Sequence, residues 1–94
     1  MKVVGRRRLY DFCQRHEDAR GAALTWLAEV EDASWKTPHE LKGRYPSASF
    51  VGQKRVVFNL RGDRYRLDVK LSYQLQEAVI IRIGTHEEYD DWTF

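Results

Sequence analysis

The stretch that decides the fold is residues 64–71, which read Arg-Tyr-Arg-Leu-Asp-Val-Lys-Leu. Polar and apolar residues alternate over the whole stretch, as they do in a strand with one buried face and one polar face. The buried face is predicted to hold Tyr65, Leu67, Val69 and Leu71, and the polar face Arg64, Arg66, Asp68 and Lys70. The pattern therefore predicts a sheet with one face rich in cations.

Further strands are expected on both sides of this one. Residues 79–83 read Val-Ile-Ile-Arg-Ile and end at Gly84, so they are predicted to pair with residues 64–72 through a turn at 73–76. Their parity assigns Val79, Ile81 and Ile83 to the buried face and Arg82 to the polar one. Residues 55–60 form another strand, joined through the tight turn at 61–63, and 49–51 an edge strand. By parity, Asn59 joins the polar face.

The first half of the chain has the period of helices. Leu9, Phe12, Cys13 and His16 stand at i, i+3, i+4 and i+7, which predicts an amphipathic helix from Arg6. A second helix is expected over residues 19–33 with Asp18 as its N-cap, and a short one over 38–42. With a strand at 1–4, the expectation is an α+β fold: two N-terminal helices packed on one face of a small antiparallel sheet.

Length and charge narrow the classes of function. Residues 1–94 are expected to be a single domain, with no bilayer span, no signal peptide and no contact with a membrane. The lone Cys13 rules out an intramolecular disulfide and favours a reducing cytoplasm. The net charge is only +2, yet residues 42–70 hold eight cations against two anions. Such segregation favours a polyanionic partner, although a solvated surface of mixed charge is an equal alternative.

The chemistry-bearing residues gather near the end of the chain. The three histidines lack metal-ligand spacing, the acidic residues are scattered and no glycine-rich phosphate loop exists, so neither a metal nor a cofactor is expected. Cleavage of RNA through its own 2′-hydroxyl needs a proton-transfer group and cations for the phosphorane. The residues predicted for catalysis are His86, Tyr89, Arg66, Lys70 and Arg82, and those predicted to contact RNA are Asn59, Arg64, Lys54, Arg55 and Thr85. From the pattern alone, a histidine near the end of a sheet is usually structural.

Several segments together resemble the HigB family of bacterial type II toxins. They include residues 57–59, 62–67 and 81–90, where the Gly-Thr-His-x-x-Tyr-Asp ending that follows a Tyr-Arg-Leu strand is the most specific part. The resemblance spans nearly the whole chain. It departs at Asp63, where the family often has asparagine, but both residues suit a turn.

The resemblance implies a RelE-like fold and an mRNA endoribonuclease that inhibits translation and growth, usually on translating ribosomes. It also implies a helix-turn-helix antitoxin of the HigA type that neutralises the toxin, with operator DNA bound only through that antitoxin. Two other functions fit the residues alone. One is a non-catalytic module that binds RNA or the ribosome through the same basic face, and the other is a structural partner domain. A neighbouring helix-turn-helix gene would favour the toxin.

Overall fold

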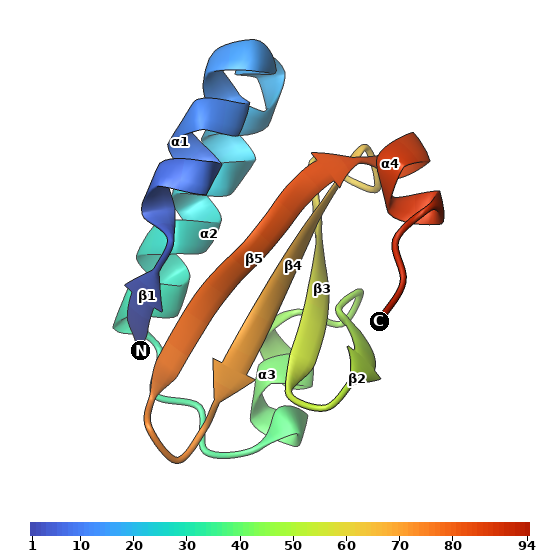
Figure 1. Ribbon diagram of the computed structural model, residues 1–94. Helices are drawn as coiled ribbons and strands as arrows, with labels where there is room; N and C mark the ends of the chain where they lie inside the picture. Colours follow the sequence, from blue (N-terminus) through green and yellow to red (C-terminus); the bar gives the residue numbers. More distant parts are fainter.

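The computed structural model describes residues 1–94 as one five-stranded sheet with helices (Figure 1). The strands stand in the order β1-β5-β4-β3-β2. In chain order the elements are β1 (Lys2–Val4), α1 (Arg6–Arg15), a 3₁₀ turn (Glu17–Ala19), α2 (Arg20–Asp32), α3 (Pro38–Arg44), β2 (Ser49–Gly52), β3 (Arg55–Leu60), β4 (Tyr65–Ser72), β5 (Glu77–Thr85) and α4 (His86–Asp90).

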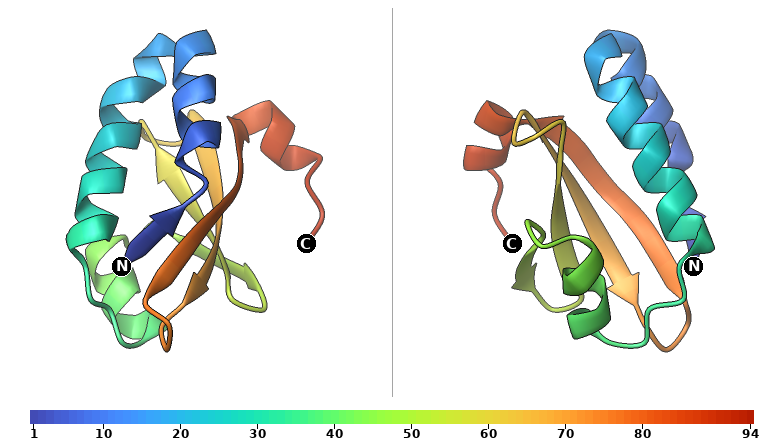
Figure 2. Two further views of the ribbon diagram at one scale, coloured as in Figure 1. Left: turned by 60° about the vertical axis from the view of Figure 1, so that its left-hand side comes forward. Right: turned by 180° about the vertical axis from the view of Figure 1, so that it is seen from behind.

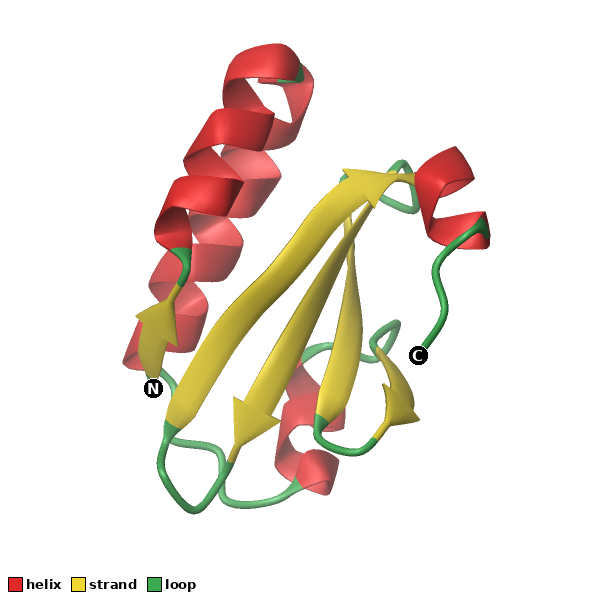
Figure 3. Cartoon of the chain, in the orientation of Figure 1, coloured by secondary structure: helices red, strands yellow, loops and turns green.

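The sheet is mixed, so the expectation of a purely antiparallel sheet is wrong at one edge. β2, β3, β4 and β5 pair antiparallel through short turns, whereas β1 runs parallel to β5 (Figure 3). Gly5 joins β1 directly to α1 with φ 92, and a Cβ there would lie 3.0 Å from the carbonyl oxygen of Ile80. Only glycine enters this left-handed region without strain, and it lets the chain turn from the sheet edge into α1.

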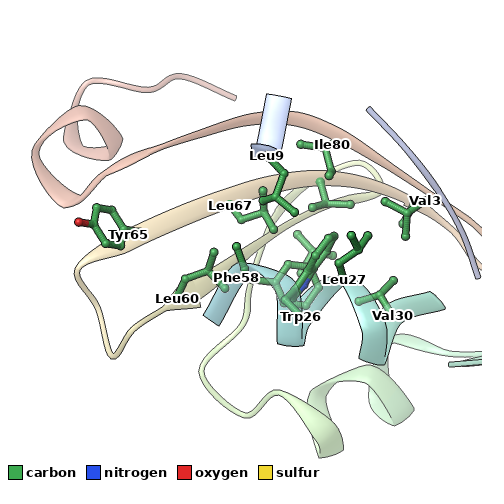
Figure 4. Packing of buried hydrophobic residues seen from close by; sticks show 14 of the residues in the cluster. Val3, Leu9, Trp26, Leu27, Val30, Phe58, Leu60, Tyr65, Leu67 and Ile80 are labelled. Atoms are coloured by element: carbon green, nitrogen blue, oxygen red, sulfur yellow. The ribbon is translucent and has the colours of Figure 1, made fainter. Parts of the chain in front are cut away.

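The core lies between the sheet and the α1–α2 pair (Figures 2 and 4). Leu9 and Phe12 of α1 and Trp26 of α2 are almost fully buried against the strands, and Trp26 contacts the Phe58 ring edge-on at 5.4 Å. The alternation predicted for β4 is confirmed on this side, because its apolar residues are all 5% exposed or less: Tyr65, Leu67, Val69 and Leu71. The α+β class is therefore established by the packing of these layers.

The junction between α1 and α2 differs from its prediction. Asp18 does not cap α2, because residues 17–19 wind into a 3₁₀ turn first and no side chain caps the helix that follows. The carboxylate of Asp18 instead reaches the sheet, where it accepts hydrogen bonds from the side chains of Arg64 and Tyr65. This short turn thus ties the helical layer to the start of β4.

A β-bulge in β5 overturns the predicted parity of that strand. Val69 pairs with Ile80, but Asp68 pairs with Arg82, so Ile81 is an extra residue with no partner on β4. The bulge shifts the alternation by one position. Ile80 is therefore 1% exposed in the core, whereas Val79 and Ile81, which were expected there, are only partly buried. Beyond the bulge the predicted parity holds, because Ile83 packs against the core.

Candidate functional site

The centre of the polar sheet face is an ionic triad of two partly exposed arginines around one buried carboxylate. Asp68 of β4 is fully buried, and its Oδ1 and Oδ2 accept hydrogen bonds from Nε and Nη2 of Arg55 at 2.9 and 2.5 Å. The Oδ2 atom also accepts a bond of 2.9 Å from Nε of Arg82. The hydrogen bond to Asp68 raises the pKa of Arg55 above its usual value. Both arginines are thus engaged in neutralising one carboxylate.

The last residues of the chain cover this triad on the side opposite to α1 and α2 (Figure 2). The guanidinium of Arg82 lies 4.4 Å from the ring centre of Trp92, and its Nη2 donates to the backbone oxygen of Thr93 at 3.0 Å. The Phe94 ring lies 5.1 Å from the Arg82 guanidinium and 5.5 Å from that of Arg55. The expectation of an open cationic face is therefore wrong for its centre, because aromatic side chains stack on these two arginines.

A second pair of predicted residues lies next to the triad, toward α4. Arg66 is only 9% exposed, and its guanidinium lies 5.0 Å from the ring centre of Tyr89. It also donates to the backbone oxygen of Asp63 in the β3–β4 turn. Asn59 stands opposite Arg66 in the sheet register, where its side chain donates to the oxygen of Ser47 at 3.5 Å. The expectation that Arg66 is openly exposed is wrong, although it does accompany Tyr89.

α4 begins at the end of the sheet beside the β3–β4 turn (Figure 1), and His86 at its start is exposed. It is the first residue of α4, and its backbone N–H donates to the oxygen of Arg64 at 3.0 Å. Thr85 and Glu88 form a capping box with bonds of 3.1 and 2.9 Å, which fixes the start of the helix. A shallow, open depression is formed here by Asp63, Arg64, Thr85, His86 and Glu87.

Arg64 is anchored on its other side by residues that the sequence pattern did not assign to the site. Its Nη1 donates to Oδ2 of Asp18 at 2.9 Å, and the Tyr65 hydroxyl donates to Oδ1 at 2.5 Å. The bond from Tyr65, helped by the bond from Arg64 and by the charges of Arg61 and Arg64, lowers the pKa of Asp18, and the bond between Tyr65 and Asp18 raises the pKa of Tyr65. The one available signal was a tyrosine hydroxyl at the start of a buried strand, which needs a polar partner.

Lys70 and Lys54 lie at the opposite end of the sheet. Lys70 pairs in register with Arg55 and Val79, five residues along β4 from Tyr65, which pairs with Thr85. At about 3.3 Å per residue, Lys70 is therefore roughly 16 Å along the strand from the His86 end. Both lysines are exposed, take part in no ion pair and border a second groove with Leu75 and Glu77. The predicted cations are thus divided among three places on the sheet.

Two general properties of the structure bear on the site. The chain forms no group of three histidine, cysteine or acidic side chains that could hold a metal ion. None of the helices combines the length and apolar character needed to cross a membrane.

Comparison with known proteins gives one family. The sequence profile of the HigB toxins, described as the RelE-like toxic component of a toxin–antitoxin system, matches residues 19–92. The mRNA interferase toxin HigB of Escherichia coli K12 is 24% identical over 95 residues, covering 99% of this chain and 91% of that protein. The mRNA interferases HigB of Escherichia coli O157:H7 and Shigella flexneri match with the same identity and coverage. The profile matches most of the chain, and the chain folds as an α+β domain. This protein therefore belongs to the HigB toxin family, the RelE-like toxic components of toxin–antitoxin systems.

Proposed function

We propose that residues 1–94 form a single toxin domain that cleaves mRNA as an endoribonuclease. The observation that carries the proposal is that the exposed His86, at the start of a helix held by a capping box, lines one open depression together with Arg64. The mRNA interferase names of the relatives support the same activity. A shallow, solvent-open site suits a single RNA strand laid across it better than a small substrate, which prefers an enclosed pocket.

The reaction requires the substrate's own 2′-hydroxyl as the nucleophile. Its oxygen bonds to the adjacent phosphorus while its proton passes to a base, and the bond from phosphorus to the 5′ oxygen breaks as that oxygen receives a proton. The products are a 2′,3′-cyclic phosphate and a free 5′-hydroxyl. Imidazole exchanges protons readily near neutral pH, so we assign a proton-transfer step to His86.

We assign the remaining roles, which are charge stabilisation and phosphate binding, to the cations according to their positions on the sheet. The side chain of Arg64 is 60% exposed and Arg64 lines the same depression as His86, so we assign it to the negative charge that develops on the phosphorane. Arg66 and Tyr89 pack against each other outside the residues that line the depression, and we assign the phenol ring to stacking a base there. We assign Lys70 and Lys54 to phosphates farther along the strand. In this arrangement Arg82 and Arg55 hold the triad together, and Thr85 and Asn59 support the backbone around the site.

The toxin of a toxin–antitoxin system has an antitoxin as its partner. We propose further that this antitoxin is a helix-turn-helix protein of the HigA type, that operator DNA is bound only through it, and that the toxin acts in the cytoplasm on mRNA held by the ribosome. We also propose that cleavage needs no metal at the site, because the acidic and histidine side chains form no ligand cluster and Asp68 is already shared by two arginines.

The proposal is tested by mapping mRNA 5′ ends after induced expression of the parent, His86→Ala and His39→Ala. His39 is exposed in α3 and outside the depression, so its variant is the matched control. His86→Ala should lose roughly 10²–10⁴ in cleavage rate, the usual share of general acid–base catalysis, while His39→Ala keeps the parent's rate. A His86→Ala protein that melts like the parent and cuts RNA at the parent's rate would remove histidine from the mechanism. Efficient cleavage of RNA with a 2′-deoxy group at the scissile nucleotide would exclude the 2′-hydroxyl route.

The exposed lysines favour a second candidate, a non-catalytic module that binds RNA or the ribosome. Lys54 and Lys70 carry their charge far from His86, so binding and cleavage are separable. Lys54→Glu with Lys70→Glu should weaken binding of single-stranded RNA and flatten its salt dependence, by about 0.7 in the log–log slope for each phosphate that is no longer neutralised. If His86→Ala still arrests growth while no cut ends appear in either protein, the binding module is the correct function.

A further inference from the structure

We propose that Asp18, in the turn between α1 and α2, is a positioning residue that orients the side chain of Arg64 at the depression that Arg64 shares with His86. The inference rests on the proposed function, since it assigns the cause of the geometry at that site. Asp18 is 46 positions from Arg64 in the sequence and belongs to the helical layer, so the contact joins the two halves of the molecule.

The geometry gives Asp18 a defined orientation of its own. Its two carboxylate oxygens have different partners, because Oδ1 accepts from the Tyr65 hydroxyl and Oδ2 from Nη1 of Arg64. Its backbone oxygen accepts from Nη1 of Arg61 at 3.2 Å. Tyr65 is a core residue that is 5% exposed, and its ring meets Phe12 edge-on at 5.5 Å. The bond to this core tyrosine therefore orients the Asp18 carboxylate independently of its bond to Arg64.

Arg64 needs such an anchor because its own surroundings leave it free. Its side chain is 60% exposed, and no other side chain forms an ion pair with it. An arginine on the surface samples many rotamers, and each must be given up before the guanidinium can meet a phosphate. Asp18 removes part of that freedom in advance. Arg61 also lies within 3.7 Å of Oδ2, so two cations share this one anion, while Asp63 and Glu87 add two carboxylates to the depression.

A purely structural role for the same contacts makes a different prediction. If Asp18 only fastens the α1–α2 turn to β4, its loss lowers the melting temperature without altering cleavage by the folded protein. If Asp18 positions Arg64, the loss of Asp18 lowers the rate at which the folded protein cleaves RNA. This decrease occurs only while Arg64 is present. A double-mutant cycle on kcat/KM separates the two roles.

The experiment compares the parent, Asp18→Ala, Arg64→Ala and the double variant for cleavage of one RNA, with thermal melts of each. Asp18→Ala is expected to lose about tenfold in kcat/KM in the parent and less than about twofold in the Arg64→Ala background, the non-additivity of residues that act as one unit. Glu31→Ala is the matched control, because it breaks a similarly exposed ion pair with Arg6 that is not part of the depression. It should cleave at the parent's rate.

Tyr65→Phe keeps the experiment decisive if Asp18→Ala does not fold. It removes the bond to Oδ1 while retaining the core ring, so it should lose about two- to fivefold in kcat/KM, again only with Arg64 in place. Parental cleavage by folded Asp18→Ala or Tyr65→Phe, or losses that multiply in the double variant, would overturn the inference. A different result marks failure of the proposed function itself: His86→Ala and Arg64→Ala would then both leave RNA cleavage unchanged.

Discussion

Two neighbouring isoleucines of β5 give the most direct test of the bulge. Ile80 is 1% exposed and belongs to the core, whereas Ile81 is partly buried and lies outside the core cluster. An unbroken alternation of β5 would place Ile81 in the core instead. Replacing each by alanine makes the same chemical change at adjacent positions, so the difference in the free energy of unfolding reports the parity of the strand.

The magnitude follows from the atoms removed. Isoleucine to alanine deletes about three carbon groups, worth roughly 0.8 kcal/mol each when buried. When the cavity that remains is included, Ile80→Ala should lower the free energy of unfolding by about 3 kcal/mol, within the range of about 2–5 kcal/mol for core sites. In a domain of this size that loss lowers the melting temperature by roughly 12–24 °C. Ile81→Ala should lose about 1 kcal/mol, because only part of its surface is removed from water.

The assay is urea unfolding followed by circular dichroism, with both variants measured beside the parent. Equal m-values would show that the change lies in stability and not in the extent of unfolding. The reasoning is refuted if the two losses are equal, or if Ile81→Ala is the more destabilised variant. The second outcome would mean that β5 pairs with β4 without the bulge.

Two other perturbations address the ionic contacts. Asp68→Asn leaves Arg55 and Arg82, whose side chains are 26% and 32% exposed, without their shared anion. It should lower the free energy of unfolding by about 1.5–3 kcal/mol, as loss of hydrogen bonds to a charged group does. A loss below about 0.5 kcal/mol in urea titration would contradict the triad. Asp18 has a pKa lowered from 3.8 in the folded protein, so its contribution to stability is complete well above that value and is lost as the pH falls through the lower folded pKa. Thermal melts from pH 5 to pH 2 should therefore show a shallower decline for Asp18→Asn than for the parent, and parallel curves would show that these contacts do not stabilise the ionised carboxylate.

Much of the fold was predictable because the local patterns were clean. The alternation of β4 and the helical stripe at Leu9, Phe12 and Cys13 each report one buried face, and burial is what such periods measure. The direction of β1 was not predictable, since it depends on which strand it joins and not on its own residues. The bulge at Ile81 was hidden for a related reason: four of the five residues from 79 to 83 are apolar, so either parity looked acceptable.

The candidate site was predicted in its residue types more than in its arrangement. Thr85 caps a helical turn that begins at His86 at the end of the sheet, although the residue pattern had predicted no cap there. The parity rule also placed Arg66 and Arg82 on one face correctly, but it carries no information about what covers that face. The aromatic tail and the contact from Asp18 to Arg64 both join segments distant in the sequence, so no local pattern reveals them.

The aromatic cover on the ionic triad has a consequence for how members of this lineage can diverge. Asp68, its two arginines and the rings of Trp92 and Phe94 come from four separate segments, yet each is placed by the others. Substituting Asp68 alone leaves two guanidinium groups without their anion, and substituting Trp92 or Phe94 alone removes a stacking partner. We expect these positions to covary among relatives, so that the whole set is either conserved or replaced together. A statistical coupling between positions as far apart in sequence as 55 and 94 should then be detectable among relatives.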